Sequence, residues 1–189
     1  MRSIEVRAPV PEILIVVVAV VVALVRGGRY GGIPQFRWWW VLWGAVACEG
    51  VALAVHAVQP FAVSAAYVAI VLFLGANLKW FEFRIVLIGA AMNAIEVWAN
   101  KGVMPVYVKI PLFSRAALHS LTVHYFWHEA LTHHTVFPIL SDILYVNFPE
   151  PMMFSFGDIF IWIGTFLVIQ RFLNKPIPIA KWVGLDSQG

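Results

Sequence analysis

The chain has 189 residues, of which 61% are hydrophobic and only 12% are charged. Since water-soluble domains carry about 25% charged residues, this composition argues against an ordinary soluble enzyme or binding module. It predicts one membrane domain over residues 1–189. The formal net charge is +3, but the basic residues lie singly between apolar runs, so nucleic-acid binding is not expected.

Five apolar segments predict membrane-spanning helices, which need about 20 residues each. In chain order they cover about 10–25, 38–58, 61–78, 83–98 and 157–173. The second begins with Trp38–Trp40, a pattern typical of the membrane–water interface. Only "QP" separates the second segment from the third, so these two are expected to form an antiparallel hairpin. The expected fold class is an all-α integral membrane protein.

A long insert, residues 99–156, separates the fourth and fifth helices. Residues 114–135 show a helical apolar pattern with five histidines, which predicts an amphipathic helix at the interface or against the bundle. Residues 136–155 are broken by prolines and predict a re-entrant or interfacial hairpin. The sequence leaves open whether the insert supplies a sixth span.

The distribution of Lys and Arg predicts the orientation in the cell membrane, because cytoplasmic loops carry an excess of these residues. With five spans, one side holds Arg26, Arg29, Arg37, Lys79, Arg84, Arg171, Lys175 and Lys181. The other side holds Arg2, Arg7, Lys101, Lys109 and Arg115. We therefore expect the N-terminus outside and the C-terminus in the cytoplasm.

Polar side chains interrupt the fourth apolar segment. Asn93, Glu96 and Asn100 stand at i, i+3 and i+7, on one face of a helix. An ionisable residue in a spanning helix costs about 2.5–3.5 kcal/mol at the bilayer centre, so these side chains should face protein or water. They predict either a proton relay, ion pathway or catalytic site, or a hydrogen-bonded polar core between helices.

Glu49 and His56 form a second polar pair, seven residues apart on one face of the second helix. Such a pair can pass protons or orient a ligand. The alternative is a neutral Glu bonded across helices, with His56 at the interface.

The fifth helix begins with a capping-box pattern. Ser155 precedes Asp158 by three residues, with Asp in place of the usual Glu. Asp142 follows Ser141 at a turn with the same appearance. We expect Ser155 and Asp158 to be the partners of the polar face, with Asn100 nearest to them and the insert folded over the cluster.

The insert histidines do not match a metal motif. His124 and His128 are four apart, but "HEALT" places Thr132 where a zinc-protease motif requires its second histidine. A two-histidine metal site, or a haem held by His56 and an insert histidine, is the weaker alternative. The sequence predicts no metal and no cofactor.

Three fragments, "MNAIEVWANKGVMPV", "LTHHTVFPILSDIL" and "FSFGDIFIWIG", resemble a family of small uncharacterised bacterial multi-helix membrane proteins, a domain of unknown function. The matching positions are Asn93, Asn100, Gly102, Met104, Pro105, Thr135, Asp142, Ser155, Gly157 and Asp158. The resemblance covers the second half of the chain and "RGG" after the first helix. It implies a membrane protein of five or six helices and no particular activity.

The favoured function is a subunit or scaffold of a larger membrane complex, with membrane-protein partners or further copies of itself in the lipid bilayer. The small size, little soluble mass and nine tryptophans support this reading. One alternative is a transporter or channel subunit with a polar path through Glu49, Asn93 and Glu96. Another is a membrane enzyme on a lipid-like substrate that uses Asp158, Asp142, Asn93 and a histidine.

Overall fold

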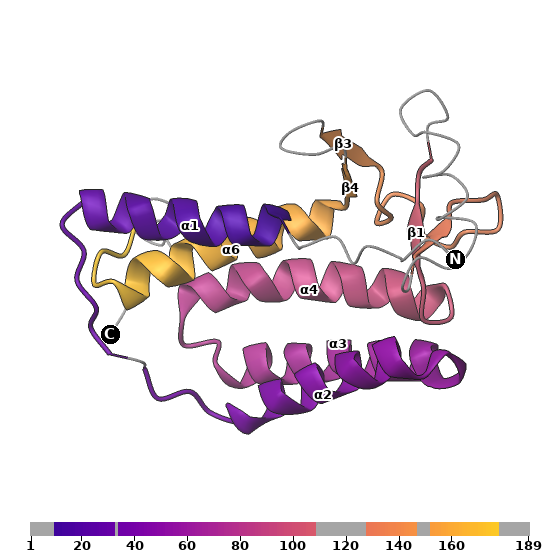
Figure 1. Ribbon diagram of the computed structural model, residues 1–189, viewed down its shortest axis with the longest axis horizontal. Coiled ribbons are helices and arrows are strands. Elements are labelled where there is room, and N and C mark those ends of the chain that lie inside the picture. The colour runs from indigo at the N-terminus through magenta and orange to yellow at the C-terminus, as the bar shows by residue number, and fades with distance from the viewer. Residues whose placement is uncertain (1–9, 33, 109–127, 147–151, 178–189) are drawn as a thin grey trace.

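The computed structural model describes residues 10–32, 34–108, 128–146 and 152–177 (Figure 1). Most of the described chain is helical. The helices are α1 (Val10–Val25), α2 (Trp40–Ala54), the 3-10 turn η1 (His56–Val58), α3 (Gln59–Ala76), α4 (Phe81–Ala99) and α6 (Phe156–Phe172). The strands are β1 (Met104–Val106), β2 (His128–Ala130), β3 (Leu144–Val146) and β4 (Met152–Phe154).

Each of the five expected helical segments overlaps one α-helix, which confirms the mostly helical fold. The predicted end of the second helix, at residue 58, is wrong. α2 ends at Ala54, and Gln59 and Pro60 belong to the first turn of α3 instead of forming the connection. Proline is favoured in a first helical turn because its missing N–H has no intrahelical partner there. The turn between α2 and α3 is therefore made by Val55 and η1.

The expectation of an all-α protein is corrected by two short sheets beside the C-terminal end of α4 and the N-terminal end of α6 (Figure 1). β2 pairs in parallel with β1, so residues 128–130 form a strand where the sequence pattern predicted a helix. The backbone amide of Leu131 extends this pairing by donating to the carbonyl of Val106 at 2.8 Å. The rest of the expected amphipathic helix, 114–127, lies outside the described residues. β3 and β4 form an antiparallel pair within the proline-broken stretch.

The helices pack in the spatial order α2, α3, α4, α6, α1 (Figure 1). α4 and α6 approach each other most closely, because glycines face the contact. A Cβ added at Gly89 would collide with the carbonyl oxygen of Gly157 and lie 2.9 Å from the backbone nitrogen of Ile161. A Cβ at Gly164 would lie 2.8 Å from the backbone nitrogen of Val86. Small residues of this kind allow close backbone contact between helices.

Among the described residues, one helix, Gln59–Ala76, is both long and apolar enough to cross a membrane. Pro11–Val25 and Trp40–Ala54 are apolar but shorter. Large apolar side chains are exposed along these helices, for example Val17 and Trp43. Several polar side chains are buried between helices: Asn77, Glu82, Asn93, Glu96, Ser155 and Gln170. Large apolar side chains thus face outward along these helices, and a set of polar side chains is buried together with the apolar core.

The glycine contact gives a stability prediction. Gly89→Ala should destabilise the protein by about 1–3 kcal/mol, the usual cost of overpacking, because its Cβ would meet backbone atoms of α6. Gly44→Ala in α2 is the matched control, since nothing lies within 4 Å of its added Cβ. It should be neutral or stabilising by up to about 1 kcal/mol through helix propensity. Thermal unfolding in detergent measures both; equal midpoints for the two variants would contradict the close contact.

Candidate functional site

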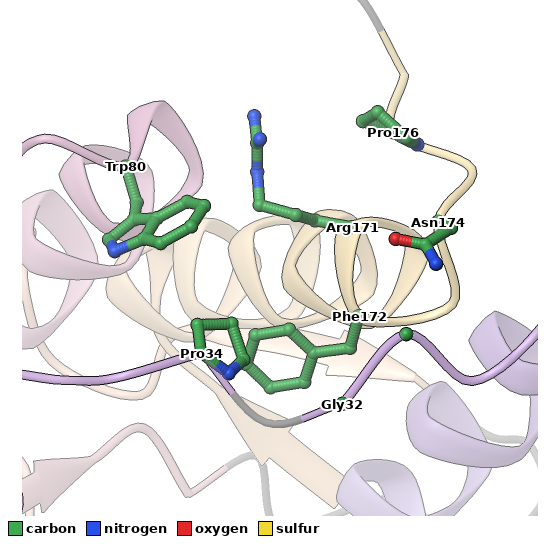
Figure 2. A pocket seen from close by; sticks show the side chains of 8 residues that line it. Gly32, Pro34, Trp80, Arg171, Phe172, Asn174 and Pro176 are labelled. Carbon is green, nitrogen blue, oxygen red and sulfur yellow. The ribbon is translucent and has the colours of Figure 1, made fainter.

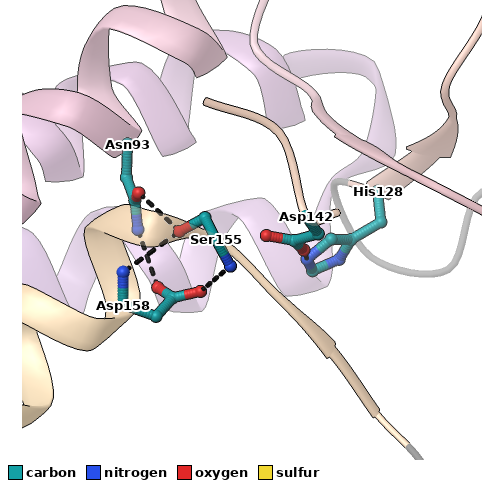
Figure 3. A network of polar contacts seen from close by, with 5 residues as sticks. All are labelled: Asn93, His128, Asp142, Ser155 and Asp158. Carbon is teal, nitrogen blue, oxygen red and sulfur yellow. Dashed lines mark hydrogen bonds and ion pairs between the residues drawn. The ribbon is translucent and has the colours of Figure 1, made fainter. Parts of the chain in front are cut away.

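The start of α6 is joined to α4 by a ring of four hydrogen bonds among Asn93, Ser155 and Asp158, here called the polar junction (Figure 3). Asn93 Nδ2 donates to Asp158 Oδ1 at 2.8 Å, and Ser155 Oγ donates to Asn93 Oδ1 at 2.9 Å. The amide of Ser155 donates to Asp158 Oδ2 at 2.8 Å, and the amide of Asp158 donates to Ser155 Oγ at 3.1 Å.

The last two bonds make the capping box that the sequence pattern predicted, with Asp158 in the position usually held by Glu. Gly157 is required beside it, because a Cβ there would collide with the side-chain oxygen of Asn93. Ser155 is fully buried and Asn93 is 4% exposed. The cap of α6 therefore also serves as the polar contact between two helices.

Glu96, one turn further along α4, joins the insert to the bundle. Its Oε1 accepts from Ser141 Oγ at 2.6 Å and from Asn100 Nδ2 at 3.0 Å, and its side chain is fully buried. Asn100 also holds the insert, because it donates to the carbonyl of Val136 at 3.0 Å and accepts from its amide at 2.9 Å. The described part of the insert thus lies over the C-terminal end of α4.

Asp142 reaches the same region through the insert backbone. Its amide donates to the carbonyl of Pro105 at 3.0 Å, and its carbonyl accepts from the amide of Tyr107 at 2.8 Å. Its side chain is buried, and Oδ2 lies 3.5 Å from Nε2 of His128, an ion pair only when the imidazole is protonated (Figure 3). Burial raises the pKa of Asp142 well above its usual value, and the carboxylates of Asp158 and Glu96 raise it further.

Glu96, Asp142 and Asp158, here called the carboxyl cluster, are close enough for their charges to oppose one another. Within the part of the chain that the structure describes, Glu96 Oε2 and Asp142 Oδ1 are buried without a hydrogen-bond partner. An unpaired buried carboxylate oxygen is costly, and holding a proton removes that cost. The chemistry available here is therefore proton uptake and release. The described residues contain no group of three His, Cys, Asp or Glu side chains arranged to hold a metal.

The structure brings together most of the residues singled out from the sequence, with one correction. Asn93, and not Asn100, contacts Ser155 and Asp158. Asn100 lies about two helical turns beyond Asn93, so its partners are Glu96 and the insert. The sequence predicted that α6 begins beside the end of α4, near Asn100. Gly157 instead lets α6 begin against the middle of α4, beside Asn93.

The second predicted pair lies elsewhere. Glu49 is exposed on α2, away from the buried face that packs on α3. His56 lies in η1, and its side chain is outside the described part of the structure. Glu49 is therefore not part of the polar junction.

Sequence reasoning missed Tyr67 and the role of Ser141. Tyr67 in α3 places its phenol against Asn93, within reach of the charges of Asp158 and Asp142. Its position in an apolar run gave no signal, because tyrosines are common in membrane helices for their interfacial role. Ser141 was read only as a turn residue, although it is fully buried against Glu96.

The fold and the site define a mostly helical protein in which the buried carboxyl groups of Glu96 and Asp142 and the partly buried cap carboxylate of Asp158 lie at one end of α4 and α6. Residues 34–170 match a family of unknown function (DUF5317), and the chain belongs to that family. The match includes α2, α3, α4 and the polar junction, and it leaves α1 and the "RGG" stretch outside. No curated protein and no solved structure matches the chain. An uncharacterised family was expected, and this is confirmed.

The raised pKa of Asp142 gives a pH prediction with a definite sign. In the unfolded chain this carboxyl ionises near its usual pKa, about 3.9, whereas the folded carboxyl keeps its proton to higher pH. Between these pKa values folding takes up a proton, so the free energy of unfolding falls as pH rises, by at most about 1.4 kcal/mol per pH unit. Asp142→Asn should remove this slope in thermal midpoints measured against pH. The exposed carboxylate Glu12 is the control; a Glu12→Gln variant that flattens the profile as much as Asp142→Asn would contradict the assignment.

Proposed function

We propose that the protein is a multi-pass helical membrane protein that acts as a subunit or scaffold of a larger membrane complex. Support for the membrane comes from the distribution of polarity: exposed apolar side chains surround α1 and α2, and carboxylates and amides are buried between α4 and α6. A helix in hydrocarbon has to place polar groups against protein. α1, α2 and α6 have 16, 15 and 17 residues, and local thinning of the bilayer accommodates short spans.

The orientation proposed is N-terminus outside and C-terminus in the cytoplasm. Basic residues gather where α1 and α6 end and α2 and α4 begin: Arg26, Arg29, Arg37, Lys79, Arg84, Arg171 and Lys175. The carboxyl cluster lies at the opposite ends of α4 and α6. Positive residues mark the cytoplasmic side, so the cluster and the described part of the insert lie outside.

The observation that carries the subunit role is Glu49. It lies on an exposed stripe of α2 with Leu42, Val46 and Leu53, at i, i+4, i+7 and i+11. It stands nine residues after the start of α2, about 13 Å along the axis. Among the described side chains, none forms a hydrogen bond or an ion pair with the Glu49 carboxylate. A lipid-facing carboxylate costs about 2.5–3.5 kcal/mol, and a hydrogen-bond donor on a partner helix relieves that cost.

A polar path through Glu49, Asn93 and Glu96 has less support, because Glu49 faces outward whereas the other two are buried between helices.

A second candidate function is a membrane enzyme on a lipid-like substrate. The observation in its favour is the gathering of Asn93, Asp142, Asp158 and His128 at the outer end of the bundle (Figure 3). Asp142 and His128 are positioned to exchange a proton. The subunit role is preferred because Asn93 and Asp158 are already engaged in capping α6. A His128→Gln strain with unchanged membrane lipids would exclude the enzyme.

The subunit role predicts a complex that depends on Glu49. After gentle solubilisation of native membranes, the tagged wild-type protein should migrate in a complex of defined mass with fixed stoichiometry. Glu49→Leu removes the carboxylate that a partner has to satisfy, so it should shift most of the protein to the mass of the free chain.

Glu12→Gln is the matched control, because it removes an exposed carboxylate at the start of α1 instead of one within the apolar stripe of α2. This variant should retain the complex. A wild-type protein found only as a single chain, or a complex indifferent to Glu49→Leu, would contradict the proposal.

A further inference from the structure

A cavity of about 290 Å³ opens at the basic end of the bundle, opposite to the carboxyl cluster (Figure 2). It lies between the loop after α1, the residue before α4 and the C-terminal end of α6. Its walls include Gly31, Gly32, Trp80, Arg171, Phe172 and Asn174. Nothing in the proposed subunit role uses this cavity.

Arg171 is the charged side chain in the wall, and its orientation is fixed by two neighbours. Its Nη2 lies 2.7 Å from Oε1 of the nearly buried Glu82, and its Cζ lies 5.1 Å from the centre of the Trp80 ring. The side chain remains 34% exposed. Figure 2 shows the guanidinium projecting between Trp80 and Pro176. A guanidinium has five N–H donors, so Glu82 leaves donors available to a second anion.

The surroundings of the cavity are positive. Lys79 is exposed with its Nζ 5.2 Å from the Trp80 ring, and Lys175 follows α6 on the same side. Within the described chain at this end, Glu82 is the acidic group, and it is already paired with Arg171. An anion entering the cavity therefore meets a net positive charge, which Lys79 and Lys175 add to the Arg171–Glu82 pair.

The volume of the cavity and the two glycines in its wall, Gly31 and Gly32, indicate which class of ligand it can hold. Pockets for drug-sized ligands start at about 300 Å³, so this cavity suits a phosphate group with a short ester better than a whole nucleotide. Gly32 has φ +89° and nothing within 4 Å of an added Cβ, so the wall is open backbone there. Gly31 lies so close to Asn174 that an added Cβ would collide with its amide. At Gly32 the absence of a side chain lets an anion approach the backbone closely.

We propose that this cavity binds the phosphate group of an anionic ligand, with the Arg171 guanidinium as its electrostatic anchor. Arg is suited to this task because its planar fork matches phosphate oxygens. The phosphate can belong to an anionic phospholipid headgroup or to a soluble phosphate ester, and the chemistry of recognition is the same.

Titration calorimetry on the purified full-length protein in detergent tests the site with three probes: short-chain phosphatidylglycerol, glycerol 3-phosphate and short-chain phosphatidylcholine. At least one anionic probe should bind, and the zwitterionic probe should bind at least about tenfold more weakly. Binding of phosphatidylglycerol alone assigns a lipid headgroup, and binding of both anionic probes assigns the phosphate itself.

Arg171→Gln with Glu82→Gln removes the anchor without leaving the Glu82 carboxylate unpaired, and it should weaken anionic binding at least about tenfold. Arg84→Gln is the control for charge, because Arg84 is an exposed basic residue at the same end of α4. It should change the affinity less than about twofold. The double variant is compared only if its thermal midpoint shows that it is folded, and Arg171→Lys, which keeps the charge but loses the fork, replaces it otherwise. No binding of either anionic probe, or equal weakening in Arg84→Gln, would overturn the site.

Discussion

The contact between α4 and the start of α6 is the constraint on which the rest of the structure depends. Gly89 and Gly157 bring the two backbones together, and this approach places Asn93 within 2.8 Å of Asp158. Asp158 then has two duties, because it caps its own helix and accepts from a neighbouring one. The polar junction is compatible with an apolar environment because its donors and acceptors satisfy each other.

The insert packs on the C-terminal end of α4, next to this contact. Glu96 and Asn100 extend the polar face of α4 and bind Ser141 and the backbone of Val136. β1 continues directly from α4 and pairs with β2, and it also supports Asp142 through backbone hydrogen bonds. The carboxyl cluster is therefore a consequence of covering a polar helix end with a polar loop. Its unpaired oxygens at Glu96 and Asp142, among the described residues, favour a bound proton.

The helices could be predicted from the sequence because apolar runs of this length have few alternatives to a helix. The capping box was also predictable, since it depends on two residues three positions apart. The sequence predicted Asn100 as the partner of Asp158, about two helical turns beyond the actual partner, Asn93. The position at which α6 meets α4 is set by glycine contacts between segments that are distant in the sequence, and spacing within one helix does not show them. The strand at 128–130 was missed for a similar reason, since its backbone partners lie in β1, more than twenty residues earlier. Glu49 and His56 share a helical spacing, but spacing alone could not show that Glu49 faces outward.

Cross-linking between cysteines in intact cells tests the α4–α6 contact most directly. Asn93→Cys and Asp158→Cys would be combined in a Cys48→Ala background, where Cys48 is the single native cysteine. A short bifunctional thiol reagent should join this pair efficiently, because the two side chains are in hydrogen-bond contact. It should join Asn100→Cys with Asp158→Cys poorly, because Asn100 lies about 10 Å further along α4. Efficient cross-linking of the second pair with none of the first would contradict the account.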